Sequence, residues 1–334
     1  MKESLRSLAY YSAVYSGLTR LGRRLADHSG TIVLYGHRVS SDDEGYMQGL
    51  DPEWLDQQLA YLCSHFEIVP LQVLVDALRA RRPAPTNSVV LTFDDGFRDN
   101  YEQAFPLLRK YGVTATVFAV TGSLTHGDLP WSQRLGFLFQ HTFREEFQHT
   151  LTNHSLLPLG TAGQRKSAYR LVKPAVSRMP REQRDAAITS LAAALDVEPP
   201  RDRMMTWDMA RDMQAAGIEI GAHTYSHPLL AQMDKREAEW EMRKSAQDLR
   251  RELGVEQPAF CFPAGSMNAA LLQRVQDLGF RSCFLPGQAI RINRADTVGP
   301  YTMTRVGLPN ASAVHLEAEL DGPFHTLRRF AGRY

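Results

Sequence analysis

Short apolar runs alternate with amphipathic stretches along most of the chain, and this pattern predicts an α/β fold. Continuous apolar runs are typical of buried strands, and they occupy residues 31–35, 88–93, 114–120, 218–222, 259–262 and 280–284. Apolar residues at three- and four-residue spacing predict helices at 52–65, 71–82, 99–111, 207–216, 235–253 and 268–278. Because strand, helix and strand follow one another repeatedly, we expect parallel strands in a (β/α) barrel, with an open doubly wound sheet as the alternative.

The alternation stops between residues 122 and about 206, where helical stretches dominate. These stretches lie at 134–141, 168–176 and 181–195. We interpret this region as a helical insertion within one barrel domain of residues 29–312. Residues 313–334 form a C-terminal extension in this interpretation.

Residues 1–28 predict a single amphipathic helix. Its apolar positions recur at three- and four-residue steps, at Leu5, Leu8, Tyr11, Tyr15, Leu18, Leu21 and Leu25. Arginines and a lysine between them suit an interfacial helix on an anionic membrane, and the alternative is a helix packed on the protein's own body. No apolar run reaches the roughly 20 residues of a membrane span, and no signal peptide is recognisable. We therefore expect a cytoplasmic protein with peripheral membrane contact.

The charge balance excludes one class of partner. Lys and Arg number 38 against 37 Asp and Glu, which gives a formal net charge of +1. Without a basic surplus, nucleic acid is not expected as a partner. The three cysteines are widely spaced, which indicates small buried side chains in a reducing compartment and not a disulfide framework.

Two adjacent carboxylates follow the apolar run at 88–93. Asp94 and Asp95 come at its end, and Gly96 lets the chain turn sharply. In a regular strand the two side chains would point to opposite faces, but at a strand end one can bind a metal while the other stays free as a base. The alternative is an ordinary turn or helix-cap pair.

Two histidines follow another strand end. His223 and His227 come directly after the run at 218–222, and imidazole nitrogens together with a carboxylate oxygen suit a divalent metal such as zinc. With one aspartate they make three ligands, which leaves room for water as catalytic sites require.

These strand ends resemble the motifs of a known family. The string from Leu91 to Gly96 and the pair His223-x-x-x-His227 look like the first two motifs of the polysaccharide deacetylases, and residues 260–265 resemble the third. The resemblance spans residues 31–310. It implies a deformed, often incomplete (β/α) barrel and metal-dependent removal of N-acetyl groups from amino sugars. The insertion resembles that of bacterial members linked to exopolysaccharide or capsule assembly.

The resemblance also implies roles for individual residues. Asp94 would be the general base, and Asp95, His223 and His227 would hold one divalent ion. Zinc is the default from the ligand types, with cobalt, nickel or manganese as alternatives. The backbone N–H of Ala264, after the motif's proline, would stabilise the oxyanion.

The general acid is assigned to His37. The segment Leu34 to Val39 resembles the first strand of biofilm poly-N-acetylglucosamine deacetylases, although relatives have the histidine directly after the aromatic residue and here Gly36 intervenes. His315 and His325 do not match the Leu-rich C-terminal motif from which other members draw their acid.

The third motif departs from the family pattern. It lacks the arginine that orients the base, a charge that Arg305 could supply, and the alternative is a surface arginine. Ala264 replaces a larger residue and widens the pocket floor. We predict Trp131, Pro263 and Tyr225 as substrate-binding residues, with Trp131 as a sugar-stacking platform.

The sequence thus favours an N-deacetylase that acts on an N-acetylhexosamine in a polysaccharide or its precursor. One alternative is an amidase on a lipid-linked or small N-acyl sugar. Others are a non-catalytic carbohydrate-binding module and a structural metal site, which a set of only three ligands disfavours.

Overall fold

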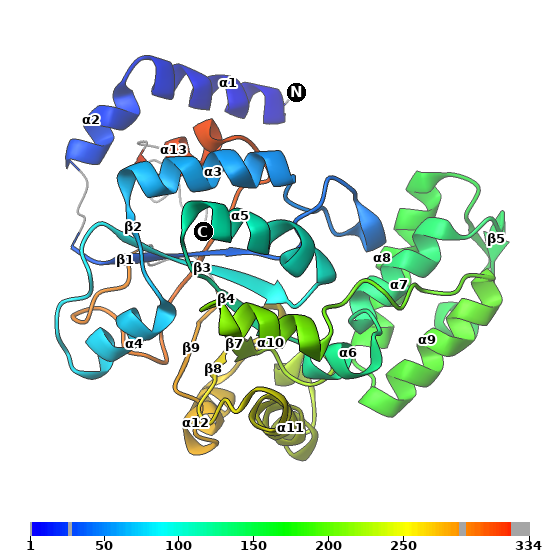
Figure 1. The fold of residues 1–334 in the computed structure, drawn as a ribbon. Helices are drawn as coiled ribbons and strands as arrows, with labels where there is room; N and C mark the ends of the chain where they lie inside the picture. The colour runs from blue at the N-terminus through cyan, green and yellow to red at the C-terminus, as the bar shows by residue number, and fades with distance from the viewer. Residues whose placement is uncertain (1, 26–28, 287–291, 322–334) are drawn as a thin grey trace.

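A curled parallel sheet forms the centre of the computed structural model, which describes residues 2–25, 29–286 and 292–321 (Figure 1). The strands run in the order β10-β1-β3-β4-β7-β8-β9. Their bounds are β1 (Thr31–Gly36), β3 (Ser88–Asp95), β4 (Thr116–Ala119), β7 (Glu219–Ala222), β8 (Ala259–Phe260), β9 (Ser282–Cys283) and β10 (Val306–Gly307), and β2 (Glu67–Ile68) pairs with the start of β3. A single parallel bridge between Phe284 and Met303 connects the two sheet edges. This arrangement confirms the predicted deformed (β/α) barrel over the open doubly wound sheet.

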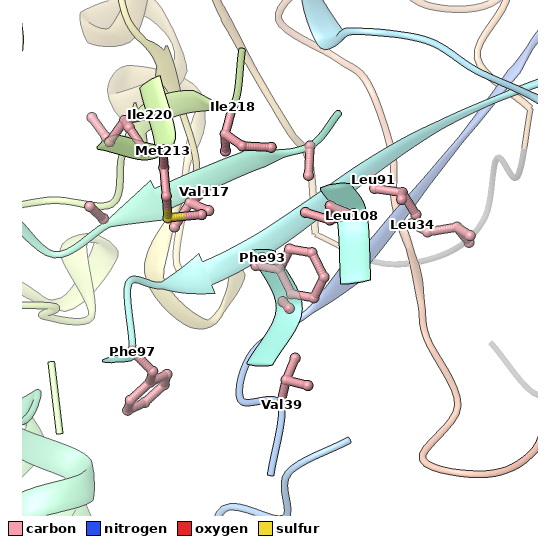
Figure 2. Close-up of a cluster of buried hydrophobic side chains, with 14 of the residues drawn as sticks. Leu34, Val39, Leu91, Phe93, Phe97, Leu108, Val117, Met213, Ile218 and Ile220 are labelled. Carbon is pink, nitrogen blue, oxygen red and sulfur yellow. The ribbon is translucent and has the colours of Figure 1, made fainter. Parts of the chain in front are cut away.

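Helices cover the outer face of the sheet. They are α3 (Pro52–His65), α5 (Phe105–Tyr111), α10 (Trp207–Ala215), α11 (Lys235–Leu253) and α12 (Ala269–Asp277). Leu91 and Phe93 of β3 lie beside Leu108 of α5 in one large apolar cluster (Figure 2). Because side chains alternate along a strand, Val90 faces the other side, where it joins a second cluster with α4 (Leu71–Arg79). Asp94 continues the inward series of Val90 and Thr92.

Several predicted elements are confirmed at their predicted bounds, and others differ for local reasons. Helices α3 and α11 match, as does α9 (Arg181–Leu195). The helix predicted at 99–111 begins instead as a π-turn, η2 (Asn100–Ala104), because Pro106 has no N–H to donate within the following helix. The short one-turn helices were not predicted: η1 (Glu44–Tyr46), η3 (Thr150–Thr152), η4 (Leu230–Gln232) and η5 (Pro263–Gly265).

The region between β4 and α10 has its own apolar core. It contains α6 (Thr121–His126), α7 (Trp131–His141), α8 (Ala162–Ser177) and α9, with a small unpredicted hairpin of β5 (Glu146–Phe147) and β6 (Leu157–Pro158). Side chains such as Leu138, Val172 and Leu191 are fully buried in this core. Helices α7–α9 stand to one side of the sheet (Figure 1).

The N-terminal region forms two helices, so the prediction of one helix over residues 1–28 is wrong. α1 (Lys2–Tyr15) and α2 (Leu18–Leu25) are separated at Gly17, whose φ of 77° breaks the helix. Both pack on α13 (Ala313–Asp321). Packing on the protein's own body is confirmed, and Figure 1 shows the two helices lying along one side of the barrel.

The face of α1 and α2 that packs is not the apolar stripe. Tyr10, Ala13 and Thr19 are buried, whereas the stripe side chains are between 37% and 79% exposed: Leu8, Tyr11, Tyr15, Leu18 and Leu21. The side chains of Leu5 and Leu25, and residues 322–334 with His325, lie outside the described residues. Within the described part of the chain, no helix has the length and apolar character to cross a bilayer.

Candidate active site

Asp94 is paired with an arginine from the far end of the chain. The two nitrogens Nη1 and Nη2 of Arg305 donate to Oδ1 and Oδ2 of Asp94, each at 2.7 Å. Nη1 also donates to Thr92 Oγ1 at 3.1 Å. Burial opposes ionisation of Asp94, but the Arg305 guanidinium outweighs it and holds the pKa of this carboxyl below its ordinary value. Arg305 is therefore not the surface residue that the sequence left open.

Asp95 leaves the strand geometry at the next residue. Its φ is 74° and that of Gly96 is 78°, so the chain turns here and the two neighbouring carboxylates both reach the same end of the sheet. Asp95 Oδ1 lies 3.2 Å from His227 Nε2 and 3.5 Å from His223 Nε2. Neither carboxylate oxygen of Asp95 accepts a hydrogen bond of normal geometry from the described residues.

The residues around Asp95 fit a divalent metal. Candidate ligand atoms of Asp95, His223 and His227 all lie within 4.8 Å of one another. His223 Nδ1 is 2.8 Å from the carbonyl oxygen of Cys261, which orients Nε2 toward Asp95. Burial lowers the pKa of His223 to about 4, so the imidazole is in the neutral form that a metal ligand requires. A buried carboxylate with no hydrogen-bond donor is explained by such an ion.

The loop that carries both histidines is strained and held from outside. Thr224 and His227 have φ values of 66° and 58°, which are unfavourable for residues with a side chain. Glu241 Oε2, from α11, accepts the backbone N–H groups of Tyr225 at 3.0 Å and Ser226 at 2.8 Å.

The insertion holds the same loop from its other side. Arg184 of α9 donates to Ser226 Oγ at 2.7 Å, and Trp131 Nε1 of α7 donates to the carbonyl of His227 at 2.7 Å. Both side chains are almost completely buried. The position of His227 thus depends on contacts from the barrel and from the insertion.

A pocket of about 320 Å³ opens beside Asp94 and His223. His37, Ala264 and Arg305 contribute to its lining. His37 Nε2 lies 4.0 Å from Asp94 Oδ2, and its side chain is 37% exposed. His315 lies elsewhere, because it contacts Ser7 of α1.

Ala264 sits in the one-turn helix η5 with a φ of 49°. Nothing in the described part of the chain accepts a hydrogen bond from its backbone N–H. Pro263 is the first residue of this turn, and it is buried outside the pocket lining. This residue fixes the turn that places Ala264, and a direct substrate contact at Pro263 stays a prediction.

A model of the polysaccharide deacetylase family matches residues 81–283, more than half of the chain. The chain belongs to the polysaccharide deacetylase family. This agrees with the motif order at Asp94–Asp95, His223–His227 and Pro263.

Similarity to individual deacetylases is local in sequence and wider in fold. Over 123 residues the chain is 31% identical to the poly-β-1,6-N-acetyl-D-glucosamine N-deacetylase of Escherichia coli. The matched region is 36% of this chain and 18% of that protein. Over 68 residues it is 38% identical to YxkH of Bacillus subtilis, covering 20% of this chain and 24% of that protein. The matched regions thus span less than a quarter of each curated relative. The deacetylase PplD of Streptococcus pyogenes, solved with acetate, shares the fold with a TM-score of 0.56 and 20% identity over 86% of this chain and 95% of that chain.

Two predicted substrate residues lie outside the deacetylase pocket. Trp131 is only 3% exposed and the Arg184 guanidinium lies 5.7 Å from its ring centre, so little of the ring is free to stack on a sugar. It borders a second pocket, formed with the insertion, and its substrate contact stays a prediction. Tyr225 lines the same second pocket.

The role of Cys261 was not predicted from the sequence. Its Sγ lies 2.9 Å from Arg305 Nη2 and 3.8 Å from Asp94 Oδ2. Burial raises the pKa of the Cys261 thiol well above its ordinary value, so it stays neutral. Asp94, His223 and Cys261 also come close enough to form a ligand set, but the arginine on Asp94 and the neutral thiol disfavour it. Alternation along residues 260–262 was the only signal that Cys261 faces inward.

Proposed function

We propose that the protein is a metal-dependent hydrolase that removes N-acetyl groups from an N-acetylhexosamine in a polysaccharide or its precursor. The observation that carries this proposal is the pair of adjacent buried carboxylates. Asp94 has a fixed cationic partner, and Asp95 has free oxygens beside two histidines. Membership of the deacetylase family and the Escherichia coli relative support the substrate class.

Asp95, His223 and His227 would hold one divalent ion, with zinc as the first choice for this donor set. When bound, the ion supplies Lewis-acid activation of water and of the acetyl carbonyl.

The protein's own groups complete the reaction. Asp94, kept ionised by Arg305, accepts the proton of the attacking water. As water oxygen bonds to the acetyl carbon, the Ala264 N–H donates to the oxyanion that forms. His37 then donates a proton to the amide nitrogen as the C–N bond breaks, and acetate and the amine of the sugar are released. Its 4.0 Å separation from Asp94 places it at the same pocket without a direct hydrogen bond.

Two other functions remain as alternatives. An amidase acting on a lipid-linked or small N-acyl sugar would use the same groups on a different substrate. A carbohydrate-binding module would not need an ionised carboxylate held by an arginine beside a set of metal ligands, because binding alone requires no base.

Acetate release tests the proposed function. The metal-loaded protein is given N-acetylglucosamine oligomers, a small N-acetyl sugar and an activated acetyl ester, with Asp94→Asn as the inactive variant. We expect release that requires both metal and Asp94, because a general base contributes about 10²–10⁴ to the rate. Turnover of the oligomers over the small sugar supports a polymeric substrate. Unchanged release by Asp94→Asn would refute the assigned base, and metal binding without any release would favour the binding module.

We also propose peripheral contact with an anionic lipid surface through α1 and α2. The apolar side chains Leu8, Tyr15, Leu18 and Leu21 are exposed on α1 and α2, and Arg20 and Arg24 of α2 are exposed as well. The Tyr11 ring is partly exposed and contacts His315 of α13 edge-on. Such a combination of apolar and basic side chains binds at a headgroup interface.

Vesicle sedimentation tests this contact. The wild-type protein should sediment with phosphatidylcholine vesicles that contain phosphatidylserine, and the double variant Tyr15→Ser/Leu21→Ser should not. Leu171→Ser is the matched control, because Leu171 is 58% exposed on α8. Equal sedimentation of both variants would contradict the proposal. Fractionation of cells that produce the protein tests the predicted cytoplasmic location and membrane association.

A further inference from the structure

A second pocket lies where the insertion meets the metal-binding loop. It has a volume of about 270 Å³, and its lining comes from α6, α7, α9 and the connection at residues 128–130, together with Tyr225 and Ser226. Among the described residues, none of positions 122–206 lines the deacetylase pocket. If the insertion contributes to ligand binding, it therefore does so at this second pocket.

The two pockets are close neighbours. His223 lines one and Tyr225 the other, and two residues span at most about 7 Å of chain. The side chain of Trp131, at the edge of the second pocket, donates a hydrogen bond to the carbonyl of His227. The two pockets share no lining residue, so a glycan with one sugar at Asp94 would reach the second pocket by passing over the loop at residues 224–227.

Aromatic and planar polar groups line this pocket. The Tyr225 hydroxyl and His126 Nε2 are hydrogen-bonded at 2.9 Å, which leaves the tyrosine ring in a fixed position. Arg134 and Asp185 form an ion pair at 2.6 Å. Arg181 and Lys244 lie 6.0 Å and 5.4 Å from the centre of the Tyr225 ring, so the hydroxyl edge of this residue is the part that borders the pocket. Guanidinium and carboxylate groups offer the paired donors and acceptors that neighbouring sugar hydroxyls match.

The charges of the lining cancel. Two arginines, Arg134 and Arg181, stand against Asp128 and Asp185. Asp185 is within 4.0 Å of both arginines. This balance favours an uncharged ligand over a phosphate or a uronic acid. The volume, slightly below the roughly 300 Å³ of the smallest drug-sized pockets, suits a single sugar ring.

We propose that this pocket binds an uncharged hexose or N-acetylhexosamine unit of the same glycan, next to the unit that is deacetylated. The proposal rests on the proposed function and deepens it, because it makes the insertion the part of the protein that distinguishes an oligosaccharide from a single sugar. Arg134 and Asp185 are the specificity-determining pair.

The dependence of KM on oligomer length tests the proposal. Acetate release is measured with β-1,4- and β-1,6-linked N-acetylglucosamine oligomers of one to five units. In the wild type we expect KM to fall about tenfold once the chain is long enough to fill both pockets, a change that corresponds to about 1.4 kcal/mol. In Arg134→Gln and Asp185→Asn the ratio of KM for short and long oligomers should approach one. Arg144→Gln is the matched control, since Arg144 forms an exposed ion pair with Asp196 elsewhere in the insertion.

Binding is measured separately from turnover. Calorimetry with the metal-loaded Asp94→Asn variant gives the affinity for the same oligomers, alone and combined with Arg134→Gln. Weaker binding of long oligomers in the combined variant supports the proposal. Wild-type length dependence in both pocket variants, with normal folding by thermal unfolding, would overturn it. If the wild type releases no acetate from any oligomer, the proposed function fails, and the calorimetry alone decides whether the second pocket binds sugar.

Discussion

Asp94 and Asp95 are neighbours in the sequence and almost equally buried, at 3% and 1% exposure, but their surroundings are opposite. Both oxygens of Asp94 accept hydrogen bonds from Arg305. Those of Asp95 accept none of normal geometry and face two imidazoles. Burial opposes the charge of each, and the pKa of each is nevertheless lowered, by Arg305 in one case and by His227 in the other.

The difference indicates how one strand end supplies two functions. A buried carboxylate needs a counter-charge. For Asp94 a permanently charged arginine provides it, so this carboxylate does not depend on a bound metal ion. Asp94 can then stay ionised inside the protein as a base. Asp95 has no such partner, so its oxygens remain open to a cation from outside the protein.

Of the three substitutions that test the difference between Asp94 and Asp95, removal of the Asp95 carboxylate should have the largest effect on metal binding and activity. In Asp95→Ala two histidines remain, and we expect the bound metal to fall from one ion per chain to nearly none, with loss of acetate release. Elemental analysis of the dialysed protein measures this. Asp212→Ala, at an exposed aspartate of α10, is the control. An Asp95→Ala protein that retains a full ion would show that the ligand set is wrong.

Replacement of Arg305 should make Asp94 behave as an unpaired buried carboxyl. In Arg305→Met, burial is no longer outweighed, so the pKa of Asp94 rises and the base becomes protonated at higher pH. We expect the acidic limb of the kcat/KM profile to move to higher pH, and kcat/KM at neutral pH to fall about a hundredfold. Arg305→Lys keeps the charge and should give an intermediate shift. An unchanged pH profile in Arg305→Met would show that Arg305 does not set the pKa of the catalytic base.

A smaller effect is expected from the support of the histidine loop. Glu241→Gln removes the carboxylate that accepts hydrogen bonds from the backbone N–H groups of Tyr225 and Ser226, just before His227. We expect metal affinity to weaken about tenfold, the lower end of the effects seen when groups behind metal ligands are removed. Competition with a chromophoric chelator measures the affinity. Glu239→Gln on the same helix is the control, because Glu239 pairs with Arg243 at the surface. Equal metal affinities of Glu241→Gln and the wild type would show that Glu241 is not needed to position the histidine loop.

The positions of the ligands were predictable from the sequence because parallel strands end at one edge of the sheet. Asp95 ends one strand and His223 and His227 follow another, so their meeting required only the correct order of strands. The partner of Asp94 was less predictable, since Arg305 lies 211 residues away and its direction depends on the closure of the barrel. The φ of Asp95, which decides where its carboxylate points, has no signal beyond the glycine that follows.

Apolar periodicity predicted that the N-terminus is helical but did not indicate which face packs. Tyr10 is buried through a hydrogen bond to Glu319, and Thr19 donates to Glu317 at 2.6 Å. Polar contacts to α13 thus select the face, and the apolar stripe remains outside. Trp131 shows the reverse, because a large aromatic residue that suggested a sugar platform is used inside the protein to hold a backbone carbonyl.

The ion pair of Asp94 and Arg305 also has a consequence for the order in which the chain folds. A partly formed sheet of β1, β3 and β4 contains the carboxylate but not its counter-charge, and one unpaired member of a buried pair costs about 3–5 kcal/mol. Contacts between residues so distant in the chain form slowly. We therefore predict that burial of the Asp94 side chain is coupled to the docking of the strand that follows Arg305, so that the end of the barrel that holds the base closes together with the C-terminal part of the domain.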